Sequence, residues 1–419
     1  MLVFKFGGAS VKSSGGILNL AHILESFANE NLVIVISAFG KNTNALEKVQ
    51  NLAFNNKSYE NELNAVKEYH FNILDELFSN RKNQIFKEIE NDFISLNSLL
   101  ASGKFESFDQ MYDQIVSFGE LFSTKIVSAY LNERGIANTW VDIRKHIITD
   151  STFREGIVNW ETTSQKITKT FTFNKNRVFL TQGFLGGTPE GLTTTLGREG
   201  SDYTAAILAY ILNSEKVIIW KDVPGVLNAD PKYFDNTVRL GQLSYTDAIE
   251  LTYYGATVIH PKTIKPLQNK NINLHVKSFV YPSDPGTIIG CCVYDLLIPC
   301  FIFKMEQVLL SISPKDFSFI AESNLKDIFT LFTKYGLKIN LMQNSAISFK
   351  VCIDNKSERV SELLKELESQ FSISVETGLE LITIRYYDTQ TIDRVMVNKE
   401  LVLEQKNSKT IQMVVRSVN

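Results

Sequence analysis

The sequence has few of the features that mark exported, membrane-spanning or nucleic-acid-binding proteins. Its formal net charge of −3 leaves no basic surplus for a phosphate backbone, so nucleic acid is a poor partner. No apolar run is long enough to span a bilayer, and the N-terminus lacks the basic and apolar regions of a signal peptide. The four cysteines do not have the spacing of a zinc site or of a disulfide framework; they are Cys291, Cys292, Cys300 and Cys352. We therefore expect a soluble, cytoplasmic protein with reduced thiols and small-molecule ligands.

The length and composition predict more than one domain. A chain of 419 residues with 44% hydrophobic and 21% charged residues is globular and exceeds what one compact core usually fills. The glycine-rich loops of the first part disappear after the segment YPSDPGTIIG at 281–290. We therefore predict one domain at 1–290 and a second region at 291–419.

The first region alternates short apolar strands with helical segments. The strands end at or near glycine, and 58–135 has helical spacing throughout. The predicted strands are 2–6, 32–39, 177–187 and 216–225, and a helix is predicted at 202–212. This order predicts an α/β fold with a mostly parallel sheet between helices, whose ligands bind beyond the carboxyl ends of the strands.

The second region shows a different pattern. From about 307 to 378 its elements follow the order βαββαβ, which is typical of a ferredoxin-like α+β unit. A second, truncated copy consists of 379–419, and the apolar segment 298–304 supplies an additional strand to it.

The segment KFGGASV at 5–11 is a candidate phosphate site. Gly7 and Gly8 follow a strand, where backbone amides can approach an anion closely and the next helix N-terminus adds its dipole. Lys5 supplies a positive charge beside the turn. A structural turn with a solvated lysine remains the alternative.

The segment GREGSDYTA at 197–205 is a candidate site for an acid. The guanidinium of Arg198 suits a carboxylate, Ser201 offers a hydroxyl, and Asp202 would lie at the start of a helix. A helix cap beside a solvated arginine is the alternative, because an aspartate in the first turn also suits the helix dipole.

Three further segments carry polar groups beside apolar stretches. Ser37 and Thr43 follow the second strand, and Glu120 stands within an apolar helical segment, where a carboxylate is either exposed or paired. Taken separately, a capping role and a surface position are the simpler interpretations of these residues. The turn-rich segment 221–232 suits adenine and ribose but is also an ordinary connection.

In this order and at these separations, the motifs resemble those of the aspartate kinase family, a branch of the amino-acid kinases. The resemblance covers nearly the whole chain and continues through FGEL at 118, TQGFLGG at 181, KDVPGV at 221 and YYGATVIHPKTI at 253. It implies the amino-acid kinase fold followed by ACT regulatory domains, the second one truncated.

The resemblance also implies roles for the substrate side of the site. Lys5 and Asp202 would assist phosphoryl transfer to the β-carboxylate of aspartate, which is ionised at neutral pH and needs no general base. Four residues would hold aspartate: Thr43, Glu120, Arg198 and Ser201. The implied reaction converts ATP and L-aspartate into 4-phospho-L-aspartate and ADP, and opens the biosynthesis of lysine, threonine and methionine.

ATP would be bound with Mg²⁺, which the phosphates and water would mainly hold. The implied nucleotide residues are Gly7, Gly8, Lys221, Asp222 and Lys232.

Several positions depart from the family pattern, mostly on the nucleotide side. Glu199 replaces a usual glycine and places negative charge near the triphosphate. Tyr203 replaces a small or hydroxyl residue, Lys221 a threonine, Leu227 an aromatic residue and Thr257 a lysine. These departures weaken the nucleotide assignments more than the aspartate assignments.

In the ACT region, Asn340 and Ala346 stand where lysine-inhibited relatives carry acidic groups, which predicts weak or no lysine inhibition. An amino-acid effector and pairing into a homodimer are expected of such a region. Two alternatives remain open for the function: a sibling kinase of another acidic amino acid, and a catalytically weak amino-acid sensor.

Overall fold

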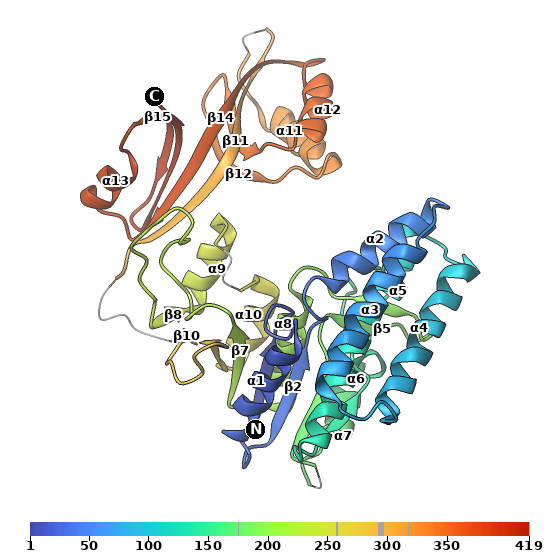
Figure 1. Ribbon diagram of the computed structural model, residues 1–419. Coiled ribbons are helices and arrows are strands. Elements are labelled where there is room, and N and C mark those ends of the chain that lie inside the picture. Colours follow the sequence, from blue (N-terminus) through green and yellow to red (C-terminus); the bar gives the residue numbers. More distant parts are fainter. Residues whose placement is uncertain (175, 257–258, 292–296, 317, 419) are drawn as a thin grey trace. The chain divides into compact units, whose positions relative to one another are not determined.

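The computed structural model describes residues 1–174, 176–256, 259–291, 297–316 and 318–418 (Figure 1). It forms two compact units that alternate along the chain. Unit 1 comprises Met1–Val226, Arg239–Ile249 and Val258–Val293. Unit 2 comprises Leu227–Val238, Glu250–Thr257 and Tyr294–Asn419. The domain limits 1–290 and 291–419 stay a prediction.

Unit 1 contains an eight-stranded sheet in the order β3-β4-β2-β1-β7-β9-β10-β8. Neighbouring strands pair in parallel, except that β10 is antiparallel to β9. The strands are β1 (Leu2–Phe6), β2 (Leu32–Ile36), β3 (Thr139–Val141), β4 (Val178–Gln182), β7 (Lys216–Lys221), β8 (Gln242–Ser244), β9 (Asn273–Ser278) and β10 (Thr287–Gly290). A separate antiparallel pair joins β5 (Leu185–Gly187) to β6 (Thr193–Thr195).

Helices cover this sheet and extend from it as a bundle (Figure 1). They are α1 (Ser14–Glu25), α2 (Asn42–Phe54), α3 (Glu60–Leu77), α4 (Gln84–Ser102), α5 (Phe108–Val116), α6 (Phe118–Glu133), the short 3-10 helix η1 (Ile143–Lys145), α7 (Trp160–Thr170), α8 (Gly200–Leu212), α10 (Pro261–Asn269) and the first half of α9 (Tyr245–Tyr254). The second half of α9, from Glu250, belongs to unit 2. Of these, α3 to α6 form the helical subdomain predicted at 58–135, and α8 is the helix predicted at 202–212.

The central strands are apolar because both of their faces are covered. Every residue of β1 and β2 is buried, including Lys5. Lys5 pairs in register with Val35 of β2 and Ile219 of β7, so its side chain lies at the middle of the sheet near the carboxyl ends of the strands. The glycine turn follows at once, which places it at the edge where ligands bind in such sheets.

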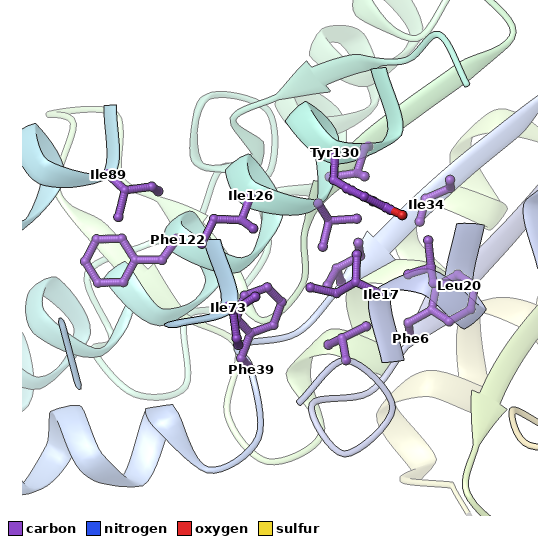
Figure 2. Close-up of a cluster of buried hydrophobic side chains, with 14 of the residues drawn as sticks. Phe6, Ile17, Leu20, Ile34, Phe39, Ile73, Ile89, Phe122, Ile126 and Tyr130 are labelled. Atoms are coloured by element: carbon purple, nitrogen blue, oxygen red, sulfur yellow. The ribbon is translucent and has the colours of Figure 1, made fainter. Parts of the chain in front are cut away.

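The core of unit 1 continues from the sheet into the helical bundle. Figure 2 shows Phe6 and Ile34 of the strands together with side chains of α1, α3, α4 and α6. Phe93 and Phe122 stack at a centroid distance of 4.2 Å, joining α4 to α6. This packing fixes α6, which carries Glu120, relative to the sheet.

Unit 2 contains one antiparallel sheet of six strands in the order β12-β13-β11-β14-β16-β15. The strands are β11 (Cys300–Pro314), β12 (Ile339–Asn344), β13 (Phe349–Asp354), β14 (Phe371–Arg385), β15 (Lys399–Lys406) and β16 (Thr410–Ser417). The helices are α11 (Glu322–Lys334), α12 (Ser357–Leu367) and α13 (Thr389–Val395). The predicted βαββαβ order and the truncated second copy are both present.

Two strands are longer than predicted. The segment 298–304 and the first strand of the unit predicted from about 307 form the single strand β11, and β14 likewise continues from that unit into the copy predicted from 379. Each strand carries an irregularity where the sequence pattern breaks: Glu306 has φ 53° in β11, and Gly378 has φ 69° in β14.

Among the described residues, Cys291, Cys300 and Cys352 are free thiols, and Cys292 lies outside that part of the chain. Within the same residues no helix combines the length and apolarity needed to cross a bilayer.

Candidate functional site

A cavity of about 630 Å³ opens in unit 1 at the carboxyl ends of β1, β2 and β7. Ten residues singled out in the sequence line it: Lys5, Gly8, Ser37, Thr43, Glu120, Arg198, Glu199, Ser201, Asp202 and Lys221. These residues come from β1 and the turn after it, the loop after β2, β7, α2, α6, the loop before α8 and α8 itself. The fold therefore gathers in one place motifs that are more than 200 positions apart in the sequence.

A buried ion pair joins the strand end to the helix start. Lys5 Nζ lies 2.7 Å from Asp202 Oδ1, and the two side chains are 11% and 4% exposed. Burial alone would raise the pKa of the Asp202 carboxyl, but the positive charges of Lys5 and Lys221 outweigh burial and hold that pKa below its ordinary value. Asp202 is therefore a carboxylate, and it holds the Lys5 ammonium at the edge of the cavity.

Glu120 is buried in the wall of the cavity, contrary to the simpler surface interpretation. It is 2% exposed, and its Oε1 accepts a hydrogen bond of 3.3 Å from the backbone N–H of Ala38. Its Oε2 has no hydrogen-bond partner among the described residues. Burial raises the pKa of Glu120 to about 8, although the hydrogen bond from the Ala38 N–H lowers that pKa by a smaller amount. A cationic group in the cavity would satisfy this oxygen.

The glycine turn holds the backbone close to the loop after β2. A Cβ on Gly8 would lie 2.6 Å from the Ala38 carbonyl oxygen and 2.8 Å from that of Gly40, so no side chain fits there. A Cβ on Gly7 would lie 3.4 Å from Lys5 Nζ, which places this glycine beside the ion pair. The turn and the Ala38–Gly40 loop thus form one wall of the cavity.

The loop that carries Arg198 and Ser201 is fixed at its centre by Glu199. Glu199 has φ 55°, a left-handed conformation that explains why a glycine suits this position. Its Oε2 accepts a hydrogen bond of 2.9 Å from the backbone N–H of His260, at the start of α10. The Glu199 carboxylate therefore accepts a hydrogen bond from a backbone N–H at the N-terminus of α10. The sequence predicted only that its negative charge would repel a triphosphate.

Where the structure describes them, the other residues that depart from the family pattern, and the other residues predicted to bind the nucleotide, do not line this cavity. Tyr203 lines a different cavity of unit 1, of about 780 Å³. Asp222 follows β7 and is exposed, whereas Lys232 and Leu227 belong to unit 2. Thr257 lies outside the described residues. The assignments of Asp222 and Lys232 to the nucleotide stay predictions.

Sequence reasoning gave no role to several residues that line the same cavity. They include Tyr112 of α5, Arg154 and Glu155 of the loop before α7, Phe184 after β4 and Thr195 of β6. Phe184 belongs to the motif TQGFLGG, whereas no local motif marks the other four, although Arg154 and Glu155 are adjacent charged residues before a glycine. Their place in the site depends on contacts between distant segments.

Unit 2 has a cavity of its own, of about 460 Å³, beside β12. It is lined mainly by aromatic, apolar and amide side chains from α9, α11, β12, β15 and β16, among them Tyr253, Phe332, Asn340, Gln405 and Gln412. Among the residues that the structure describes, no carboxylate lines it.

Comparison with known proteins identifies the family. A sequence model of the amino acid kinase family matches residues 1–278. The chain belongs to this family. The lysine-sensitive aspartokinase 3 of Escherichia coli (strain K12) is 30% identical to this amino acid kinase over 395 residues, which cover 92% of the chain and 86% of the relative. The chloroplastic aspartokinase 2 of Arabidopsis thaliana is 32% identical over 398 residues, covering 89% and 71%.

Some relatives are much longer than this amino acid kinase. The chain spans 42% of the length of the chloroplastic bifunctional aspartokinase/homoserine dehydrogenase 2 of Arabidopsis thaliana, to which it is 29% identical over 393 residues.

Solved structures agree with these matches. Aspartokinase III of E. coli in complex with lysine and aspartate, in the T-state, superposes with a TM-score of 0.83 and 26% identity over 99% of this chain and 96% of that one. The same enzyme in complex with aspartate and ADP, in the R-state, gives 0.81 and 27% with the same coverage. The amino acid kinase described here is thus similar to aspartokinases throughout, and the family and fold predicted from its sequence are confirmed.

Proposed function

We propose that the chain transfers the γ-phosphoryl group of ATP to the β-carboxylate of L-aspartate, forming 4-phospho-L-aspartate and ADP. The observation that carries this proposal is the cavity that combines the buried Lys5–Asp202 pair with Glu120 and Arg198. The similarity to an aspartokinase solved with aspartate and ADP supports the same assignment.

The chemistry needs positioning and charge more than proton transfer. A β-carboxylate oxygen forms a bond to the γ-phosphorus while the bond from that phosphorus to the departing ADP oxygen breaks. The carboxylate is already ionised at neutral pH, so no base is required. Lys5 would neutralise charge on the transferring phosphoryl group, and Asp202 would keep the Lys5 ammonium in place.

The substrate's other groups match the remaining polar residues of the cavity. Its ammonium would pair with the unsatisfied Oε2 of Glu120, and its α-carboxylate with Arg198. Thr43 and Ser201 would supply hydroxyl groups.

The phosphate side of the cavity suits a triphosphate. Gly7 and Gly8 offer a turn without side chains, Lys221 adds a second cation near Asp202, and the N-terminus of α8 lines the cavity. Among the described residues no cluster of three histidine, cysteine or carboxylate side chains offers a metal site, so Mg²⁺ would be held mainly by phosphates and water.

We further infer that the product enters lysine, threonine and methionine biosynthesis and that the chain acts as a cytoplasmic homodimer. The edge strands β12 and β15 of the six-stranded sheet present backbone groups that a second copy can pair with.

Hydroxylamine trapping tests the reaction directly. We expect the purified chain with ATP, Mg²⁺ and L-aspartate to form the aspartyl hydroxamate at a rate at least about tenfold above that with L-glutamate, because one additional methylene shifts the reacting carboxylate away from Lys5. A preference for glutamate would support a sibling kinase. No hydroxamate from either acid would favour the sensor alternative.

Lysine should inhibit the chain weakly or not at all. The side chain of Asn340 is already engaged: it donates to Gln307 at 2.9 Å and to Asp354 at 2.8 Å, and accepts from Lys304 at 2.8 Å. Asn340 therefore offers no carboxylate to the ammonium of an effector, and its side-chain oxygen already contacts the ammonium of Lys304. The check is to measure the activity of this chain against lysine concentration, with the E. coli lysine-sensitive aspartokinase 3 as the reference. Half-maximal inhibition of this chain at submillimolar lysine would contradict the prediction.

A further inference from the structure

A second arginine lines the cavity. Arg154 has φ 68°, a left-handed conformation that is uncommon for arginine. Phe184 and Glu199, which also line the cavity, share this conformation with φ values of 70° and 55°. Such backbone conformations are strained, so they persist only where surrounding contacts hold them in place. They concentrate at functional sites.

The guanidinium of Arg154 is held as a plane with a fixed orientation. Its central carbon lies 3.9 Å from the centroid of the Tyr112 ring. Nη2 donates to Glu47 Oε1 at 3.0 Å, and Nη1 donates to Asp109 Oδ1 at 3.5 Å. A guanidinium has five N–H donors, so these contacts orient the group and leave donors for a ligand.

The backbone of Arg154 is tied to the strand that leads to Arg198. Its N–H donates to Asp113 Oδ2 at 2.8 Å. The same carboxylate accepts from the backbone N–H of Thr195 at 2.9 Å and from its hydroxyl at 2.7 Å. Asp113 is fully buried, and Thr195 precedes Arg198 by three positions. One carboxylate thus couples the two segments that carry the arginines.

The charges of the cavity favour this arginine as a ligand group. Three of the lining carboxylates are engaged with the protein: Asp202 with Lys5, Glu199 with the His260 N–H, and Glu155 with Lys262 at 3.9 Å. An acidic amino acid brings two carboxylates, of which one must approach Lys5. The other requires a cation elsewhere on the wall.

We propose that Arg154 binds the α-carboxylate of the acidic amino acid together with Arg198, and that it thereby selects substrates in which this carboxylate is free. This inference rests on the proposed function.

The test compares L-aspartate with its α-amide, L-isoasparagine, which keeps the β-carboxylate and the ammonium. We expect Arg154→Gln to raise KM for aspartate roughly tenfold to a hundredfold, and to leave kcat and KM for ATP within about twofold. The preference of the wild type for aspartate over isoasparagine, measured as the ratio of kcat/KM values, should fall by about the same factor. Arg154→Lys should recover part of it, because the charge returns without the planar fork.

The matched control is Arg177→Gln, which changes an arginine that donates to the Asn29 carbonyl before β4. It should leave all these values unchanged. An equal rise in KM for aspartate and isoasparagine in Arg154→Gln would overturn the inference, because it would show that Arg154 only supports the wall. A wild type that forms no aspartyl hydroxamate would instead contradict the proposed function itself, and this inference with it.

Discussion

Replacing Lys5 by methionine should lower kcat by about a thousandfold and change KM for aspartate little. The ammonium of Lys5 is fixed at the end of β1 by Asp202, at 2.7 Å, and this buried cation lines the cavity. Charge on the transferring phosphoryl group develops in the transition state, so removal of this cation affects the rate more than ground-state binding. Steady-state kinetics with coupled detection of ADP would measure both quantities.

The same substitution also leaves Asp202 buried without its partner, which costs roughly 3–5 kcal/mol of folding free energy. The double variant Lys5→Met/Asp202→Asn removes both charges, so we expect it to regain much of the stability and none of the activity. Lys12→Met, at an exposed lysine after the glycine turn, is the matched control. A folded Lys5→Met variant with kcat within tenfold of the wild type would contradict the role assigned to Lys5.

Replacing Glu120 by glutamine should raise KM for aspartate by about a hundredfold at pH 8.5 and by much less at pH 6.5. With a pKa of about 8, Glu120 is mostly protonated at neutral pH in the free protein, and in the proposed complex the substrate's ammonium would bind its ionised form. The wild-type KM should therefore fall as the pH rises toward 8, whereas the variant, which cannot ionise, should show no such dependence.

Two further measurements separate this titration from a general effect of pH. At pH 7, aspartate binding should release a substantial fraction of one proton, measurable by calorimetry in buffers of different ionisation enthalpy. Because the folded pKa of Glu120 is above its unfolded value of 4.5, the native state binds more protons between these two values, and stability should fall as the pH rises from about 4.5 to 8. Glu133→Gln, at the exposed end of α6, should keep both dependences. Equal KM ratios at both pH values would contradict the assignment.

Much of the catalytic fold could be predicted from the sequence, because its signals are local. Apolar runs such as LVFKF and LVIVI end at glycine or polar loops, and this pattern alone places β1 and β2 and the turn between strand and helix. The segment at 197–205 likewise predicts the start of α8, where Asp202 lies.

The length of β11 and β14 could not be predicted in the same way. The polar residues Lys304, Glu306 and Gln307 interrupt the apolar pattern of β11, and Gly378 interrupts that of β14. In the structure both interruptions are irregularities within continuous strands, because pairing between β11 and β14 continues on either side of them. This long-range pairing has no local signal.

The same reason explains which features of the candidate site had no signal in the sequence. The family resemblance named Glu120, but this residue stands in a helix whose spacing does not show which face is buried, and its burial results from the packing of α6. Arg154 and Asp113 are 41 positions apart, and only their hydrogen bond reveals that they belong together.

The two long strands also set the unit in which the second region can be exchanged. Phe301 and Val308 of β11 lie in two different apolar clusters, and β14 contributes to both clusters as well, through Ile382 and Phe371. A chimera that took only the first βαββαβ unit from a relative would therefore divide two strands at their centres and join foreign cores across both cuts. Ala229 and Phe234 pack in the same cluster as Phe301, so successful recombination should exchange residues 227–238 together with residues 300–417.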